Sequence, residues 1–152
     1  MENTDALDAK ILKELQRDCS MALEELGDRI GLSRNAVWRR VKMLEERGII
    51  RARVALLDPA KVDCGLMVYI AVRTDAHDPD WLTKFASATR DMPEITGVYR
   101  MTGDLDYLIR ARISDIAAYD ALYQRLIRKV PMSDVSASFV MEEIKDTTEL
   151  PV

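Results

Sequence analysis

Residues that carry most enzyme chemistry are scarce in this sequence. Among 152 residues there is one histidine, His77, and there are two cysteines, Cys19 and Cys64. Two cysteines so far apart provide neither a disulfide framework nor a metal-binding spacing, so we expect both to be reduced. His77 stands beside acidic residues and is typical of a solvated loop, and no serine–histidine–acid set or phosphate-binding loop is visible. We therefore expect no enzyme activity, no metal and no cofactor.

Long apolar runs are absent as well. No segment approaches the length of a transmembrane helix, and the acidic start MENTDALD is unlike a signal peptide, so we expect a cytoplasmic protein without a membrane partner. An excess of positive charge is also lacking, since 22 Lys and Arg against 26 Asp and Glu leave a net charge of -4. This balance argues against indiscriminate coating of nucleic acid but permits a localised basic surface. With 48% apolar residues, the chain can form one domain or two small ones.

Residues 20–48 are typical of two short helices joined by a tight turn. Apolar residues at helical spacing give each helix a face to bury: Leu23, Leu26 and Ile30 on the first, then Val37, Val41 and Leu44 on the second. Gly31 can end the first helix in a left-handed conformation, and Ser33 can cap the second. A further helix is expected over residues 5–17, with Thr4 as its cap. Such a unit is a helix-turn-helix, whose second helix can lie in the DNA major groove.

The second helix of this pair is rich in cations. They are Arg34, Arg39, Arg40, Lys42 and Arg47. Arg34 and Asn35 stand near its start and are types that read guanine and adenine edges, whereas Arg39 and Lys42 suit phosphate contacts. Trp38 can pack against the first helix or lie along the DNA backbone, and we expect packing, because tryptophan rarely stays exposed. The alternative to a DNA-binding unit is an ordinary pair of helices whose arginines are only solvated. The candidate DNA-binding residues are Ser33, Arg34, Asn35, Trp38, Arg39 and Lys42.

The second half of the chain alternates strands and helices. Strands are expected over residues 66–72, 95–101, 107–113 and 135–144, with helices after Asp78-Pro79 and after a Ser114 cap. The order β-α-β-β-α-β is that of a ferredoxin-like fold, so the fold class is α+β. A strand is also expected over residues 49–57. We therefore assign residues 1–51 to a helix-turn-helix domain, 52–64 to a linking strand and hinge, and 65–152 to a ferredoxin-like domain.

The sheet of this second domain requires a second cover. Two helices can cover only one face of four strands, yet strand 66–72 is apolar on both of its faces. The last strand adds an apolar side that consists of Val135, Ala137, Phe139 and Met141. A second copy of the chain is the simplest cover, so we expect a homodimer formed through the sheet. The alternative is that the hinge or the N-terminal domain covers this face.

Four segments occur in an order and spacing that point to a known family. They are LDAKILKELQRD, EELGDRIGLSRNAVWRRVKMLEERGIIRARVALLDP, TGDLDYLIRA and SFVMEEIKDTTELP. With them, the chain resembles the Lrp/AsnC (feast/famine) family of transcriptional regulators over essentially its whole length. The resemblance implies a winged helix-turn-helix that binds double-stranded DNA, a linking strand and a ligand-sensing domain. It also implies dimers that commonly assemble into octamers, and a small effector, usually an amino acid, bound between subunits near the turn that joins the second and third sensing-domain strands.

In this chain the corresponding turn is Thr102–Asp106. The Asp104 carboxylate can pair with an α-ammonium group, and Gly103 lets the backbone approach a ligand. The alternative is that Asp104 and Asp106 only form a hairpin turn, where aspartate is common. The residues that the resemblance implies for the effector site are Tyr99, Met101, Thr102, Gly103, Asp104, Asp106, Val135 and Ala137.

One departure from the family bears on the effector. The family often has two threonines, two residues apart, just before a segment like 138–140, where this chain has Val135 and Ala137. The preceding segment looks one residue short, so a slip of the alignment would put Ser136 and Ser138 there instead. With Val135 and Ala137 in place, a pocket would favour leucine-like ligands over charged ones. Two other functions stay open: an architectural DNA-binding protein without an effector, and a decarboxylase-like enzyme on the same fold.

Overall fold

The computed structural model describes residues 4–75 and 78–152, and it divides into two compact units. The first unit comprises Met1–Ala55 and Ile144–Val152, and the second comprises Leu56–Glu143. The C-terminal segment thus groups with the first unit, whereas the sequence analysis assigns it to the second domain. His77 lies outside the described residues.

The first unit is built on three helices, as predicted. They are α1 (Ala6–Arg17), α2 (Leu23–Ile30) and α3 (Arg34–Glu46). Their apolar faces form one buried core of Ile11, Leu12, Leu26, Ile30, Val37, Val41 and Leu44. The predicted Thr4 cap is wrong, because the Asp5 carboxylate accepts the Leu7 and Asp8 backbone N–H groups at 2.9 and 2.8 Å. The Asp8 side chain in turn accepts the Asp5 N–H, which completes a capping box.

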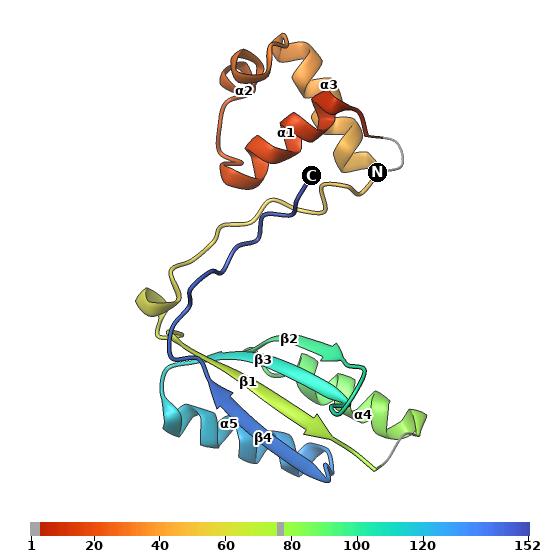
Figure 1. The fold of residues 1–152 in the computed structure, drawn as a ribbon, viewed down its shortest axis with the longest axis vertical. Coiled ribbons are helices and arrows are strands. Elements are labelled where there is room, and N and C mark those ends of the chain that lie inside the picture. Colours follow the sequence, from red (N-terminus) through yellow and green to blue (C-terminus); the bar gives the residue numbers. More distant parts are fainter. Residues whose placement is uncertain (1–3, 76–77) are drawn as a thin grey trace. The chain divides into compact units, whose positions relative to one another are not determined.

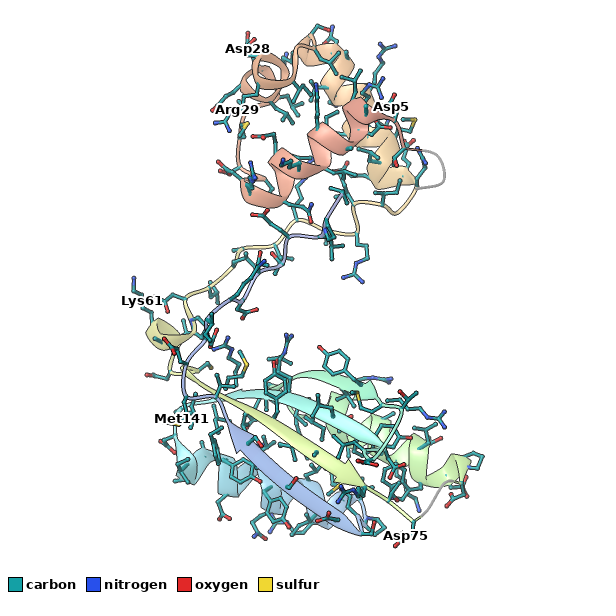
Figure 2. All side chains as sticks on the ribbon, in the orientation of Figure 1. Asp5, Asp28, Arg29, Lys61, Asp75 and Met141 are labelled. Carbon is teal, nitrogen blue, oxygen red and sulfur yellow. The ribbon has the colours of Figure 1, made fainter. Side chains whose placement is uncertain are left out.

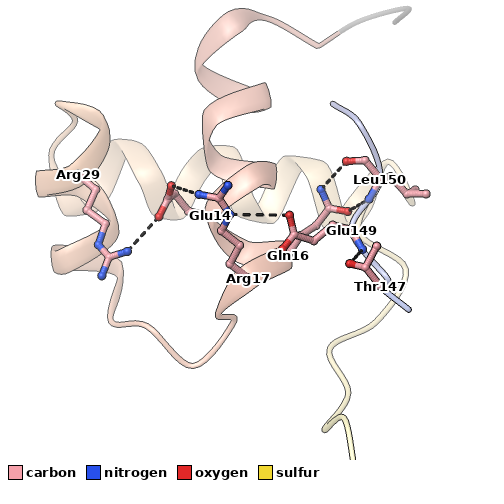
Figure 3. Close-up of polar contacts among 7 residues, drawn as sticks. All are labelled: Glu14, Gln16, Arg17, Arg29, Thr147, Glu149 and Leu150. Atoms are coloured by element: carbon pink, nitrogen blue, oxygen red, sulfur yellow. Dashed lines mark hydrogen bonds and ion pairs between the residues drawn. The ribbon is translucent and has the colours of Figure 1, made fainter. Parts of the chain in front are cut away.

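The C-terminal segment is held on α1 by side-chain contacts (Figure 3). The Gln16 amide donates to the Leu150 carbonyl oxygen at 3.1 Å and accepts the Leu150 N–H at 2.7 Å. Arg17 lies 3.8 Å from Glu149 in a looser ion pair. On the other side of α1, Arg29 of α2 bridges to Glu14. Two hydrogen bonds from one side chain account for the grouping of this segment with the first unit.

The predicted linking strand is not observed. Within the described chain, residues 49–57 pair with no other strand, so this prediction is wrong for a single copy. β-Forming residues produce a strand only where another edge supplies hydrogen-bond partners. A short 3₁₀ helix, η1 (Pro59–Val62), follows, and Asp63 ends it with a left-handed φ of 55°.

The second unit has the predicted β-α-β-β-α-β order. Its elements are β1 (Leu66–Arg73), α4 (Pro79–Arg90), β2 (Ile95–Arg100), β3 (Tyr107–Ile113), α5 (Ile116–Lys129) and β4 (Asp134–Phe139). The antiparallel sheet has the strand order β2-β3-β1-β4, and both helices cover the same face (Figure 1). Several boundaries differ from expectation, most by one residue. Asp115 caps α5 in place of Ser114, because its carboxylate accepts the Ala118 N–H at 2.8 Å, and β4 ends at Phe139.

The core of this unit lies between the sheet and the two helices. β1 contributes three fully buried residues, Val68, Ile70 and Val72. An aromatic cluster closes one end, with the Trp81 and Phe85 rings stacked at 4.9 Å. The Trp81 indole N–H donates to the Pro131 carbonyl oxygen at 2.6 Å, so this buried donor is satisfied.

The sheet register corrects part of the argument for a second cover. Val135, Ala137 and Phe139 pair with Val72, Ile70 and Val68, so they share the helix-covered face. Phe139 packs edge-on against Tyr119 of α5, with ring centroids 5.1 Å apart. Met141 lies beyond the end of β4 and is 96% exposed (Figure 2). The apolar side of the last strand therefore belongs to the core and offers no support for a dimer.

Candidate functional site

The turn between α2 and α3 depends on two glycines. Gly31 ends α2 with φ 77° and ψ 37°, as predicted from the sequence. Gly27 is the residue that the sequence analysis missed: a Cβ there would lie 2.4 Å from the Leu32 carbonyl oxygen. The Leu32 N–H donates to the Gly27 carbonyl oxygen at 2.9 Å, and the Ser33 hydroxyl accepts the Ala36 N–H at 3.3 Å. These contacts fix the start of α3 relative to α2.

One side of α3 carries the polar residues that were predicted to meet DNA. Val37, Val41 and Leu44 are buried, so most of the other positions face outward. All six candidates are exposed: Ser33, Arg34, Asn35, Trp38, Arg39 and Lys42. The helix thus presents base-reading types at its start and cations along its length, which suits a recognition helix.

Trp38 is not packed against the first helix, so that prediction is wrong. Its side chain is 51% exposed, and the Lys42 ammonium lies 5.2 Å from the centre of its ring. Val37 and Val41 already occupy the side of α3 that faces the core. One residue turns an α-helix by about 100°, so position 38 points away from that core.

Arg40 turns back to α1 and leaves the group of DNA-facing cations. Its guanidinium lies 2.8 Å from the Asp5 carboxylate and 2.7 Å from that of Asp8, which is 3% exposed. Asp5 stands at the start of α1 (Figure 2). The Asp8 backbone N–H and then the Arg40 guanidinium hold the pKa of the Asp5 carboxyl below its usual value of 3.8. The hydrogen bonds of Arg40 to the carboxylates of Asp8, first, and Asp5 raise the pKa of Arg40. Arg40 therefore ties α3 to α1.

In the second unit, residues 101–106 form the turn between β2 and β3. Gly103 has φ 96°, and a Cβ there would meet no atom within 4 Å. The backbone conformation alone thus favours glycine at this position. The Asp106 carboxylate accepts the N–H of buried Thr74 at 2.9 Å, so it holds the turn against the end of β1. The Asp104 carbonyl oxygen accepts from Arg73 at 2.8 Å, while its exposed carboxylate bonds to no described residue.

The sheet face opposite the helices lies directly beside this turn, and we name it the open face. Two rows of residues cross it, according to the strand register. Nearest the turn, Arg73 pairs in register with Asp134, and their side chains form an ion pair at 2.8 Å. The next row is Tyr99, Leu108, Ala71 and Ser136, and the row after it is Gly97, Arg110, Tyr69 and Ser138. Val135 and Ala137 point to the other face, so the register that the sequence left open places the two serines here. The open face combines apolar and polar groups, and is less apolar than the sequence suggested.

The described residues offer no metal site and no membrane-spanning helix. No group of three or more histidine, cysteine, aspartate or glutamate side chains there could hold a metal ion. Cys19 and Cys64 are free and half-buried. Within the same residues, no helix combines the length and the apolar character needed to cross a membrane.

Comparison with known proteins identifies the family. Residues 67–150 match the family model described as the Lrp/AsnC ligand binding domain, and residues 4–51 match that of a winged helix-turn-helix DNA-binding domain. The chain belongs to the Lrp/AsnC family of DNA-binding transcriptional regulators. The resemblance and the α+β fold class predicted from the sequence are thereby confirmed.

Curated relatives match along nearly their whole length. The DNA-binding transcriptional activator DecR of Escherichia coli K12 is 42% identical over 149 residues, which cover 97% of this chain and 98% of the relative. The glutamate uptake regulatory protein of Zymomonas mobilis is 44% identical over 148 residues, covering 97% and 90%. These relatives are regulators of transcription, as the exposed cations of α3 suggest.

Solved structures support the same assignment. An AsnC family transcriptional regulator from Agrobacterium tumefaciens is 49% identical with a TM-score of 0.94, and covers 97% of each chain. A transcriptional regulator from Neisseria meningitidis, solved as a complex with L-Met, is 37% identical with a TM-score of 0.93, covering 98% of this chain and 97% of that one. The two-unit architecture described above is therefore that of known family members.

Proposed function

We propose that this regulator binds DNA through α3 and responds to a small amino acid held on the open face beside the 101–106 turn. The observation that carries the proposal is the exposed Asp104 carboxylate, which bonds to no described residue and belongs to the turn at the end of the open face. A carboxylate can pair with an α-ammonium group, and hydroxyls can bond to an α-carboxylate. The L-Met complex of the Neisseria meningitidis relative supports an amino acid as the ligand class.

The open face also supports a preference for apolar side chains. Ala71 and Leu108 lie in one row of this face, with Tyr99 at its end. The charged residues near them are already paired: Arg73 with Asp134 at 2.8 Å, and Arg112 with Glu143 at 2.8 and 3.2 Å. A charged ligand side chain would find no free partner in the row of Ala71 and Leu108 and would be costly to bury there. We expect leucine- or methionine-like ligands to bind more tightly than lysine or aspartate.

The same face is the proposed contact with a second copy of the chain. Tyr69, Ala71 and Leu108 are only half-buried in the single chain, and a two-fold partner can cover them with its own copy of this surface. The effector then lies between subunits, and further assembly of dimers into octamers follows the family resemblance. We place the protein in the cytoplasm, where its DNA and amino-acid partners occur.

A regulatory function is favoured over catalysis at this site. Of the two turn aspartates, Asp106 is bonded to the Thr74 N–H, which leaves one carboxylate without a second titratable partner for acid–base chemistry. The architectural alternative without an effector rested on missing hydroxyls. With Ser136 and Ser138 on the open face, that reason is weakened.

Isothermal calorimetry across the twenty amino acids, combined with thermal unfolding, tests the proposal. We expect an apolar amino acid to bind and to raise the melting temperature by mass action. Asp104→Asn should weaken binding about 10- to 100-fold, because a charge-assisted bond contributes about 1.5–3 kcal/mol. Asp120→Asn on α5, an exposed aspartate of the opposite face, is the matched control and should bind normally.

Two outcomes would contradict this proposal in different ways. If no amino acid shifts the melting temperature at millimolar concentration, the effector is not an amino acid, and the alternative of an architectural DNA-binding protein without an effector is favoured. If binding is retained fully in Asp104→Asn, an amino acid is sensed but the site lies elsewhere.

A further inference from the structure

The two tryptophans of the chain have opposite environments. Trp81 is 4% exposed and its indole N–H is bonded to the Pro131 carbonyl oxygen. Trp38 is 51% exposed on the outward side of α3. Aromatic side chains supply large contact areas and are concentrated where proteins meet partners. A half-exposed indole on a recognition helix therefore indicates a group on the partner that it contacts.

The position of Trp38 on α3 shows which part of the partner it reaches. Arg34 lies one turn before it and Lys42 one turn after it on the same ridge. Helical side chains point back toward the N-terminus, so the indole covers the turn that carries Arg34 and Asn35. The first residues of a recognition helix are those that reach base edges. Trp38 thus lies between side chains that suit bases and a cation that suits phosphate.

We propose that Trp38 is a specificity-determining residue that packs its indole against the C5-methyl group of thymine in the major groove. This inference rests on the DNA-binding role of α3. Thymine is the base that presents an apolar group in that groove, whereas Arg34 and Asn35 suit the polar edges of guanine and adenine. An apolar surface beside them extends recognition to the third kind of base edge.

Lys42 holds the indole ready for this contact. Its ammonium lies 5.2 Å from the ring centre and 3.7 Å from the Glu46 carboxylate. A cation over one face of the ring restricts its motion and leaves the edge directed at the start of the helix free to meet DNA. Pre-ordering of this kind lowers the entropy lost when a side chain becomes fixed at an interface.

Thymine-to-uracil replacement tests the proposal directly. A duplex is selected from a random-sequence pool by the full-length wild-type protein, then synthesised with deoxyuridine at one thymine at a time. Uracil lacks only the C5-methyl group and keeps the same base pairing. We expect at least one position where the wild type loses affinity about fourfold, which corresponds to the removal of one buried methyl group.

The variants identify the side chain responsible. Trp38→Ala should bind the thymine duplex more weakly and show no penalty for uracil at that position. Trp38→Phe, which keeps an apolar ring but has no indole N–H, should retain most of the affinity and most of the penalty. Arg39→Ala is the control: it should lower the salt dependence of binding and keep the uracil penalty unchanged. Because Trp38 and Arg39 are exposed, all three variants should melt like the wild type.

Several results would overturn the proposal. The first is a wild type that binds thymine and uracil duplexes equally at every position. The second is a Trp38→Ala variant that still loses affinity when thymine is replaced by uracil. The third is a Trp38→Phe variant that binds DNA as weakly as Trp38→Ala, which would assign the contact to the indole N–H. If no duplex can be selected at all, DNA binding itself fails, and the inference fails with it.

Discussion

Substitution of Gly27 by alanine tests whether the α2–α3 turn is held by close backbone packing. An alanine Cβ would lie 2.4 Å from the Leu32 carbonyl oxygen, far inside van der Waals contact, while its 3.5 Å approach to the Val37 side chain is ordinary. The oxygen is backbone and belongs to the turn itself. The clash can therefore be relieved only by moving the turn, and with it the start of α3.

The expected loss of stability is the sum of two destabilising terms and one stabilising term. Forcing a methyl group into a packed site costs about 1–3 kcal/mol. Movement of the turn also weakens the 2.9 Å bond from the Leu32 N–H to the Gly27 carbonyl oxygen, a loss of about 1 kcal/mol. Alanine in a helix interior returns about 1 kcal/mol relative to glycine. The net loss is about 2 kcal/mol, which for a unit of this size lowers the melting temperature by roughly 10 °C.

Gly31→Ala is the matched control at the other end of the same turn. Its φ is 77°, yet a Cβ would meet nothing within 4 Å, so only left-handed strain of about 1 kcal/mol is expected. Scanning calorimetry of the full chain gives the two melting temperatures, and hydrogen exchange shows whether the loss is confined to α1–α3. A Gly27→Ala variant that is as stable as the wild type, or more stable than Gly31→Ala, would refute the packing argument.

Three further predictions concern side chains whose roles the structure shows. Arg40→Gln should destabilise the first unit by about 2–3 kcal/mol, because it leaves the buried Asp8 carboxylate without its cation, as urea unfolding followed by circular dichroism can show. The pKa of Asp5 is lowered in the folded state, so its stabilising contribution is complete above about pH 5 and is lost as the pH falls through and below 3.8. Asp5→Asn should make the fall of stability with acid less steep, and an unchanged profile would contradict the assignment. Phe139→Asp should unfold the second unit, whereas Tyr69→Asp should keep each subunit folded by circular dichroism and dissociate the dimer in sedimentation. The reverse pattern would show that the register-based faces are misassigned.

Local patterns of the sequence were sufficient for the order of elements. Helical spacing from Leu23 to Leu44, Gly31 as a stop and the Asp78-Pro79 helix start all recur in the structure, because each depends on residues within a few positions of one another. The family resemblance was recognisable for the same reason. Errors of boundary were small, such as Asp115 in place of Ser114 as a cap, where two neighbouring residues both have side-chain oxygens that can accept a backbone N–H.

The candidate site depended more on contacts between distant segments. Arg39 and Arg40 are adjacent and alike in sequence, yet one is exposed and the other is bound to Asp5 and Asp8, more than thirty residues away. The choice between Val135 and Ser136 was likewise decided by pairing with β1, because a one-residue change of register moves every side chain to the other face.

What the sequence by itself determined is therefore the order of the α-helices and of the four sheet strands, and the family, since these follow from short-range periodicity and motif order. Tertiary structure alone decided that Gly27 must lack a Cβ, that Trp38 faces outward, and that Asp106 supports the turn while Asp104 remains free. Each of these outcomes depends on whether atoms from elsewhere in the fold occupy the space around the residue. Spacing along a chain carries no information on that space until the elements have packed.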